Sequence, residues 1–338
     1  MLKKMEKPIT YLKDAGRRKN LAVVFICLNL ILLSCVCVCF SINLHTAFLK
    51  EKESMTVQEM TEESFQGVDI ALFSAGAGVS KQMREAVVSA GAVMIDNSSA
   101  FRMEDDVPLI VPEVNPDAVM GYAKRNIIAN PNCSTIITMM ALAPVARISK
   151  IKNVTATTFQ AVSGAGAAGP VELMNEVEAL RNGETYEPKV FSHQIAYNLI
   201  PQIGGEQVDG YTSEEMKMQN EGRKIMHLPD LKVSCTCIRV PVVRSHSISV
   251  SCHFDRPVSV QEVRDTIASA PGCRLVDDLK NKQYPMPLET SGQDIVYVGR
   301  IRPDLINPNG ICLWCCGDQV RKGAALNCIQ IAELLVEE

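Results

Sequence analysis

The sequence predicts an α/β protein that combines a doubly wound parallel sheet with a second, α+β part built on a mixed sheet. From residue 55 onward, apolar strand-like segments alternate with helix-like segments, which is typical of a parallel sheet. Residues 233–254 instead alternate in polarity as antiparallel strands do. The length of 338 residues, of which 47% are hydrophobic, is sufficient for two globular domains.

Charge and cysteine content exclude several classes of protein. Lys and Arg total 34 against 38 Asp and Glu, so the net charge is −4. A mildly acidic chain without a basic block is a poor candidate for binding nucleic acid. Thirteen cysteines in 338 residues are too dilute for a disulfide scaffold. They show no zinc-type pairing of C-x-x-C motifs, so we expect no metal site.

Residues 21–42 form an uncharged, apolar block that contains four of the cysteines and differs from the rest of the chain. As a helix, this block would be ~33 Å long, enough to cross a bilayer. The basic residues before it would keep the N-terminus inside the cell. A signal peptide is an alternative, although no A-x-A-like cleavage site follows. A buried helix or a pair of strands is the remaining interpretation.

The parallel-sheet part begins with a predicted strand at 68–76 that ends in a glycine-containing turn. A helix is expected at 81–91, ending at a glycine, and a strand that ends in polar residues at 92–99. Further strand-like segments follow, at 108–115 and 125–133. The ligands of such sheets gather at the carboxyl ends of the strands.

The second half begins with a long apolar helix, expected at 134–148, followed by a β-rich strand at 154–162. That strand leads into a glycine-rich turn and another helix. The antiparallel strands are expected at 233–243 and 247–254. The last two predicted elements are a helix at 257–270 with Ser259 as its N-cap and an amphipathic helix at 325–338.

Cys133 is the candidate nucleophile because it lies in NPNCST, between a strand and an apolar helix. The positive end of a helix dipole favours the thiolate form of a cysteine in the first turn. A buried, inert cysteine is the alternative. The cysteines on the expected strands, Cys235, Cys237, Cys252, Cys315 and Cys316, are predicted to belong to the core.

His246 follows an apolar strand between two serines and could act as a general base, although a structural histidine fits the pattern equally well. Arg239 lies seven residues earlier, and an odd separation on a strand places two side chains on opposite faces. A turn or bulge near Pro241 would be needed to bring them together.

The segment GAGAAG at 164–169 fits the G-x-G-x-x-G pattern of dinucleotide-binding loops. No acidic strand end follows at the expected distance of ~20 residues, so a tight turn near the active site is the alternative. Arg102 and Lys217 could bind an anion, but isolated basic residues are more often solvated surface charges.

From about residue 55 to its end, the chain resembles the bacterial aspartate-semialdehyde dehydrogenases. The segments that carry the resemblance are TEESFQGVDIALFSAG, DNSSAFRMEDDVPLIVPEVN, NPNCST, FQAVSGAG, EEMKMQNEGRKI, RVPVVRSHSISV and DQVRKGAALN. This family interconverts 4-aspartyl phosphate and aspartate 4-semialdehyde with NADP and phosphate, in lysine, methionine and threonine synthesis. The resemblance implies a cytoplasmic oxidoreductase with a Rossmann-like domain, a small-molecule substrate and a homodimeric or homotetrameric assembly.

The resemblance also assigns roles to individual residues. Cys133 would attack the aldehyde, His246 would be its acid–base partner, and Gln160 would orient the substrate. Four residues would bind the substrate carboxylate, its ammonium group and phosphate: Arg239, Glu214, Arg102 and Lys217. Six would contact NADP: Ser74, Ala75, Gly76, Ser163, Gly164 and Gln319.

The chain departs from the family at its start, where a strand and a glycine-rich phosphate loop would be expected. Residues 1–54 instead form an atypical hydrophobic segment, which leaves an incomplete NADP-binding domain at 55–132 and 317–338 beside a catalytic and dimerisation domain at 133–316. We favour a shifted reading frame, misjoined exon or wrong start for this segment over a genuine membrane anchor or surrogate strands. The alternative functions are a pseudoenzyme, an N-acetyl-glutamyl-phosphate reductase-like enzyme and a membrane-tethered protein.

Overall fold

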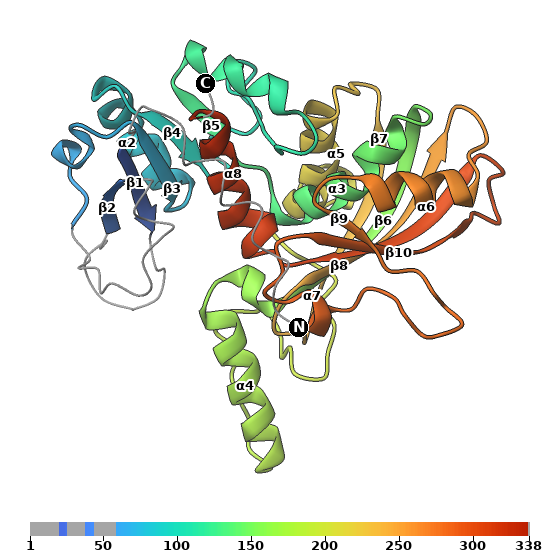
Figure 1. Ribbon diagram of the computed structural model, residues 1–338. Helices are drawn as coiled ribbons and strands as arrows, with labels where there is room; N and C mark the ends of the chain where they lie inside the picture. The colour runs from blue at the N-terminus through green and yellow to red at the C-terminus, as the bar shows by residue number, and fades with distance from the viewer. Residues whose placement is uncertain (1–19, 26–37, 44–58, 337–338) are drawn as a thin grey trace, which may run out of the picture. The chain divides into compact units, whose positions relative to one another are not determined.

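A computed structural model of the chain describes residues 20–25, 38–43 and 59–336 (Figure 1). The chain divides into two compact units. The first comprises residues up to Pro112, together with Pro116–Asn130 and the chain from Cys328 onward. The second comprises Glu113–Asn115 and Pro131–Asn327. It therefore includes residues 317–327, which were predicted to belong to the cofactor domain.

The first unit contains a five-stranded sheet in the order β2-β1-β3-β4-β5. Strands β1, β3, β4 and β5 are parallel, and β2 pairs antiparallel with β1. The predicted parallel sheet is therefore confirmed. Its strands are β1 (Asn20–Phe25), β2 (Val38–Asn43), β3 (Ile70–Ser74), β4 (Val93–Asp96) and β5 (Ile127–Ala129).

The two ends of the hydrophobic block at 21–42 are strands of this sheet, because β1 lies beside β3 and β2 beside β1. This agrees with the surrogate-strand interpretation and not with a single helix over the whole block. Residues 1–19, 26–37 and 44–58 lie outside the described residues, so a foreign origin for 1–54 stays a prediction. Within the described ranges, no helix is both long and apolar enough to cross a membrane.

Helix α2 (Ala77–Ser89) begins four residues earlier than predicted, directly after Gly76, whose φ of 83° is in the left-handed region. The predicted strand at 108–115 is wrong, because this segment makes only one isolated bridge, between Leu109 and Ala129. The core of the unit joins Ile70, Ile95 and Ile128 of the sheet to Ile331 of α8 (Leu326–Leu334). Packing of this C-terminal helix therefore completes the unit.

The second unit contains the predicted mixed sheet. It has six strands in the order β7-β6-β8-β11-β10-β9. The central strand β6 is parallel to β7 and antiparallel to β8. The strands are β6 (Ile151–Ala161), β7 (Lys232–Val240), β8 (His246–Phe254), β9 (Cys273–Leu275), β10 (Val296–Pro303) and β11 (Gly310–Gly317).

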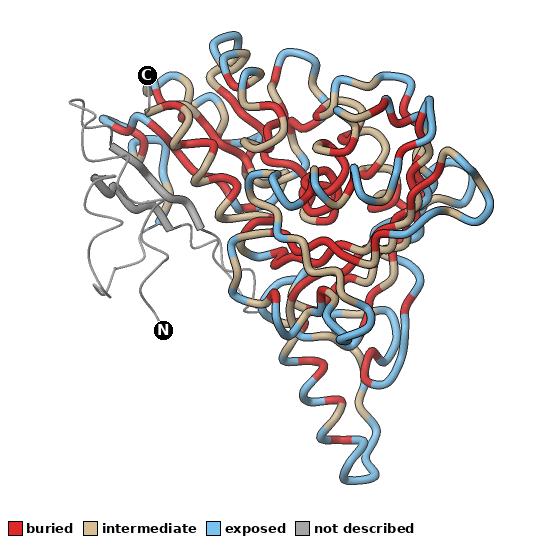
Figure 2. The backbone as a smooth tube through the Cα atoms, turned by 45° about the vertical axis from the view of Figure 1, so that its right-hand side comes forward, coloured by how far each residue is buried: buried red, intermediate tan, exposed pale blue. Residues whose placement is uncertain are grey.

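Helices α3 (Cys133–Ala146), α5 (Ser213–Ile225) and α6 (Val260–Ser269) pack on strands of this sheet, and Figure 1 shows them on one face. Ser259 caps α6 as predicted, because its Oγ accepts the Glu262 N–H while the Glu262 carboxylate accepts the Ser259 N–H. Helix α4 (Ala168–Arg181) projects from the unit. The tube in Figure 2 alternates between buried and exposed residues along α4, whereas α3 is almost wholly buried.

Candidate active site

Cys133 is the first residue of α3, and Asn132 starts this helix as its N-cap. Asn132 Oδ1 accepts the N–H groups of Ser134 at 3.0 Å and Thr135 at 3.2 Å. On the other side, Gly323 of the π-helical turn Arg321–Ala325 packs so closely that an added Cβ would lie 3.1 Å from Cys133 Cβ. The thiol is thus held at a helix N-terminus, partly exposed.

His246 lies beside Cys133, with its Nε2 atom 3.4 Å from Cys133 Sγ. Its Nδ1 atom accepts the Ala161 N–H at 3.1 Å, so the neutral ring carries its proton on Nε2, facing the sulfur. Complete burial, and secondarily the Arg239 charge, lower the pKa of His246 to about 3. The imidazole is therefore neutral at physiological pH and presents a hydrogen-bond donor to Cys133.

Arg239 and His246 converge although they lie on different strands. Strand β6 separates β7 from β8, and the turn at 241–245 carries the chain across its end. Both side chains reach Gly164, where an added Cβ would lie 2.8 Å from Arg239 Nη1 and 2.9 Å from His246 Cε1. The predicted turn near Pro241 is thus confirmed, and the glycine-rich segment forms a turn at the site between β6 and α4.

Glu214 connects a group of polar side chains in the same unit. Its Oε1 atom accepts Asn132 Nδ2 at 2.8 Å and Gln160 Nε2 at 3.2 Å, and its Oε2 atom accepts Lys217 Nζ at 2.8 Å. Burial opposes ionisation of this carboxyl group, but Lys217 and the two amide donors lower its pKa overall. Lys217 is therefore an ion-pair partner of Glu214 and not an isolated surface charge.

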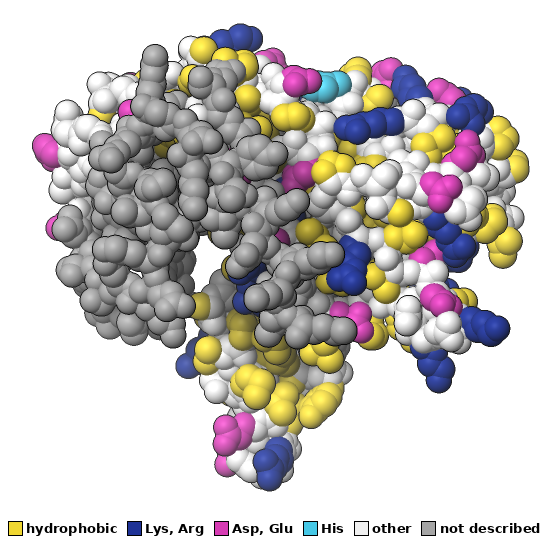
Figure 3. Space-filling view, viewed as in Figure 1, with side chains coloured by type: hydrophobic (Ala, Val, Ile, Leu, Met, Phe, Trp, Pro, Cys, Tyr) yellow, Lys and Arg dark blue, Asp and Glu magenta, His cyan; other side chains and the backbone are white. Residues whose placement is uncertain are grey.

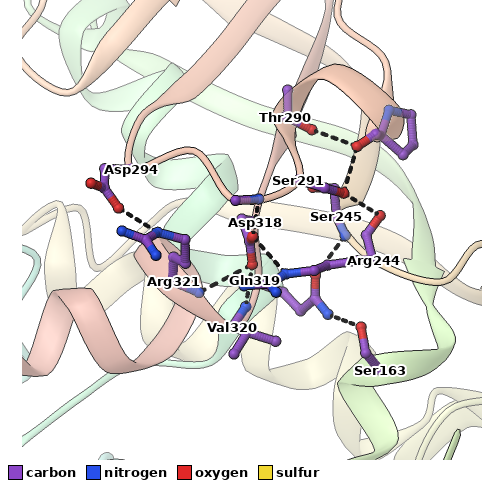
Figure 4. Close-up of polar contacts among 12 residues, drawn as sticks. Ser163, Arg244, Ser245, Thr290, Ser291, Asp294, Asp318, Gln319, Val320 and Arg321 are labelled. Carbon is purple, nitrogen blue, oxygen red and sulfur yellow. Dashed lines mark hydrogen bonds and ion pairs between the residues drawn. The ribbon is translucent and has the colours of Figure 1, made fainter. Parts of the chain in front are cut away.

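Gln319 ties two segments of the site together, as Figure 4 shows. Its Nε2 atom donates to Ser163 Oγ at 2.5 Å, and its Oε1 atom accepts the Ser245 N–H at 2.8 Å, directly before His246. The preceding Asp318 is fully buried and accepts Arg244 Nε at 2.7 Å. These contacts explain why residues 318 and 319 belong to the second unit.

Ser74, Ala75, Gly76 and Arg102 lie in the first unit. Ser74 ends β3, and Ala75 and Gly76 form the turn into α2. Asn97, just beyond β4, links this edge, because its Nδ2 atom donates to Ser74 Oγ at 3.3 Å and its carbonyl oxygen accepts Arg102 Nη2 at 2.8 Å. The polar carboxyl edge expected of this sheet is therefore present.

The second unit brings together the predicted Cys133, Gln160, Ser163, Gly164, Glu214, Lys217, Arg239, His246 and Gln319. Sequence reasoning missed Asn132, Glu221 and Asp318. The NPNCST segment contains a signal for Asn132, since asparagine before an apolar helix is a common N-cap. Glu221, which accepts the Asn132 N–H at 2.7 Å, has no such signal, because it falls on a helix rich in charged residues.

Two family models match the chain: the semialdehyde dehydrogenase NAD binding domain over residues 41–122 and the semialdehyde dehydrogenase dimerisation domain over residues 142–322. The first match begins inside the hydrophobic block and so before residue 55. An aspartate-semialdehyde dehydrogenase from Aquifex aeolicus (strain VF5) is 49% identical over 290 residues, or 86% of this chain and 85% of the relative.

Solved structures agree with these matches. The structure of aspartate semialdehyde dehydrogenase II complexed with ASA from Vibrio cholerae has a TM-score of 0.79 and 44% identity, and the match covers 83% of this chain and 82% of that one. The enzyme with NADP from Candida albicans has a TM-score of 0.64 and 26% identity, with 85% of each chain covered.

The matches to the NAD binding domain and the dimerisation domain place the chain among the semialdehyde dehydrogenases. Within that class, the identity to curated relatives shows that the chain belongs to the aspartate-semialdehyde dehydrogenase family. The alternatives of an N-acetyl-glutamyl-phosphate reductase-like enzyme or a pseudoenzyme are not favoured.

Proposed function

We propose that the chain catalyses the reversible, NADP-dependent reductive dephosphorylation of 4-aspartyl phosphate to aspartate 4-semialdehyde, in lysine, methionine and threonine synthesis. The observation that carries the proposal is the Cys133–His246 pair, with Sγ 3.4 Å from Nε2, in the same unit as Arg239 and Glu214. A nucleophile next to a proton-bearing group, with charges of both signs nearby, suits an aldehyde on a short amino-acid chain.

In the direction of semialdehyde oxidation, the Cys133 thiolate attacks the aldehyde carbon and the carbonyl π electrons move to oxygen. His246 acts as the acid partner, because its Nε2–H donates a hydrogen bond to the oxyanion of the thiohemiacetal. Bound NADP supplies the hydride acceptor for this oxidation. Phosphate then attacks the resulting thioester of Cys133, and the thiolate leaves as the acyl phosphate forms.

The remaining residues bind and orient the substrate. Arg239 pairs with the substrate carboxylate, since a guanidinium matches a carboxylate in a bidentate fork. Glu214 takes the ammonium group, while Gln160 orients the reacting end. Lys217 in the second unit and Arg102 in the first are each proposed as a phosphate ligand.

The first unit fits a dinucleotide at the turn from β3 into α2. Gly76 and Gly78 have open space where a Cβ would lie, so a ligand can approach this backbone closely. The N-terminus of α2 would favour an anionic group there. Ser74, Ala75 and Gly76 are the NADP contacts that we propose for the first unit. Ser163, Gly164 and Gln319 are those that we propose for the second unit. The dimerisation-domain match supports a homodimer or homotetramer, which light scattering would distinguish.

The proposal is tested by following NADPH formation from aspartate 4-semialdehyde with and without phosphate. We expect turnover that requires phosphate and is faster with NADP than with NAD. N-acetyl-glutamate 5-semialdehyde, in which the ammonium group is blocked, serves as the control substrate. Equal rates with both semialdehydes, or no turnover at all, would contradict the proposal.

Gly164→Ala should impair catalysis, because the new methyl group would collide with Arg239 and His246. Displacement of reacting groups by about 1 Å can lower the rate on the order of 100-fold, so we expect a loss of this size in kcat/KM. Gly205→Ala is the matched control, since its Cβ would meet nothing within 4 Å and its φ is not positive. Steady-state kinetics of the two variants should differ, and equal kinetics would argue against this close packing.

A further inference from the structure

We propose that Glu172 is a positioning residue that holds Arg239 in its substrate-binding orientation through Phe191. This inference rests on the proposed function, because it takes Arg239 as the partner of the substrate carboxylate. It concerns α4 and the segment at 189–204, which lie apart in the sequence from the Cys133–His246 pair.

Glu172 is a carboxylate built into the interior of the second unit, with 2% of its surface exposed. Its Oε2 atom accepts the N–H groups of Lys189 at 2.7 Å and Val190 at 2.8 Å, and its Oε1 atom accepts the Phe191 N–H at 2.9 Å. One side chain thus fixes three consecutive backbone donors that belong to no helix or strand. A buried carboxylate satisfied in this way holds the segment in one conformation.

Helix α4 has an exposed face and a buried face, and only the buried face holds the neighbouring backbone segment. Val171 and Met174 lie on it, 58% and 59% exposed, and Figure 3 shows apolar side chains near the base of the projecting helix and charged ones at its tip. Glu172 and Glu176 are one turn apart and both buried, so they face the segment that returns beside the helix. Glu176 holds the N–H groups of Ile195 and Ala196.

The fixed segment in turn contacts both the backbone and the side chain of Arg239. Ile200 exchanges two backbone hydrogen bonds with Arg239, of 3.1 and 2.9 Å. The Phe191 ring lies against the guanidinium, whose carbon is 5.8 Å from the ring centroid. The Ala161 carbonyl also anchors this side chain, because it accepts Arg239 Nη1 at 2.7 Å.

Phe191 and Arg239 also line the same cavity of about 290 Å³, together with Gln202 and Gly204. Burial of Arg239 and its contact with the Phe191 ring restrict the orientation of the guanidinium. Releasing the Phe191 N–H from Glu172 would free the ring and thereby loosen the guanidinium. The effect should fall on binding of the substrate carboxylate, since Glu172 touches none of the reacting atoms.

The test compares Glu172→Gln with two matched variants of the same helix. Glu176→Gln removes a buried carboxylate that holds other N–H groups, and Glu178→Gln changes an exposed one. We expect Glu172→Gln to raise the KM for aspartate 4-semialdehyde roughly three- to tenfold, as loss of a partly desolvated cation–aromatic contact would. Its kcat should change by less than about twofold, and the KM for phosphate should not change. Equal KM effects in Glu176→Gln would overturn the proposal.

Phe191→Leu keeps every hydrogen bond of Glu172 and should raise the same KM. If Glu172 acts through the ring, the double variant should be no worse than Phe191→Leu alone, whereas multiplied effects would overturn the proposal. Phe191→Leu also serves as the test if Glu172→Gln fails to fold. An unchanged KM for aspartate 4-semialdehyde in Phe191→Leu would overturn the proposal as well.

A second readout does not depend on turnover. Iodoacetate carries a carboxylate and iodoacetamide does not, so the ratio of their rates of Cys133 alkylation reports attraction by Arg239. We expect this ratio to fall in Glu172→Gln and Phe191→Leu but not in Glu178→Gln, and an unchanged ratio would overturn the proposal. If the substitutions lower this ratio but the wild-type chain does not oxidise the semialdehyde, the proposed function is refuted and the positioning role remains supported.

Discussion

Replacing Cys133 with alanine should abolish phosphate-dependent oxidation of aspartate 4-semialdehyde, with a loss of roughly 10⁴- to 10⁶-fold in kcat. The physical reason is that Cys133 combines a position at a helix N-terminus with a contact to His246. Cys252 is buried and Cys273 is partly exposed, and desolvation raises the pKa of each thiol to about 12. Their thiolate populations at neutral pH are therefore very small, whereas Cys133 is partly exposed at a helix N-terminus.

The variant should remain folded, because Asn132 caps α3 through its own side chain and does not need the thiol. Cys312→Ala, at another partly exposed thiol, is the control and should retain activity. Brief treatment with iodoacetamide should label the parent chain at Cys133 and inactivate it, and should leave Cys133→Ala unlabelled at that position. Residual turnover above a few per cent of the parent rate in Cys133→Ala would contradict a covalent route.

The sequence was sufficient to predict the elements that have local signals. The apolar helix at 134–148 occurs as Cys133–Ala146, and Ser259 caps α6, because capping and hydrophobic runs depend on neighbouring residues. The segment at 108–115 had the apolar character of a strand but makes only one bridge. Hydrophobicity alone therefore does not indicate whether a partner strand is available.

The site depends on contacts that have no local signal. Arg239 and His246 lie on strands that β6 separates, and they converge because the turn at 241–245 crosses the end of β6, which no spacing along the chain reveals. Glu172 and Glu176 have the sequence appearance of solvated helix charges, yet their partners are backbone groups about twenty residues away. The apolar block at 21–42 has the composition of a membrane helix, and hydropathy cannot distinguish one helix from strands at its two ends.

Replacing His246 with glutamine should lower kcat roughly 10²- to 10⁴-fold, the contribution of a positioned proton donor or acceptor. The same substitution should also change how stability depends on pH. The folded chain holds His246 with a pKa of about 3, because of burial and the Arg239 charge, whereas an unfolded histidine titrates near its usual 6.5. Between these values the unfolded chain binds a proton that the folded chain does not.

Stability is therefore lost as the pH falls from 6.5 toward 3, by up to about 1.4 kcal/mol for each pH unit. The variant lacks this term, so between pH 7 and pH 5 it should lose about 2 kcal/mol less of unfolding free energy than the parent. Chemical denaturation at each pH measures the difference, with the exposed His193→Gln as control. If the unfolding free energies of the parent and His246→Gln change in parallel with pH, the imidazole becomes charged inside the fold. A charged imidazole is not the neutral Nε2–H donor that the site requires. The same burial that lowers stability in acid thus keeps the imidazole neutral, and the Ala161 N–H bonded to Nδ1 keeps its proton on Nε2, facing Cys133.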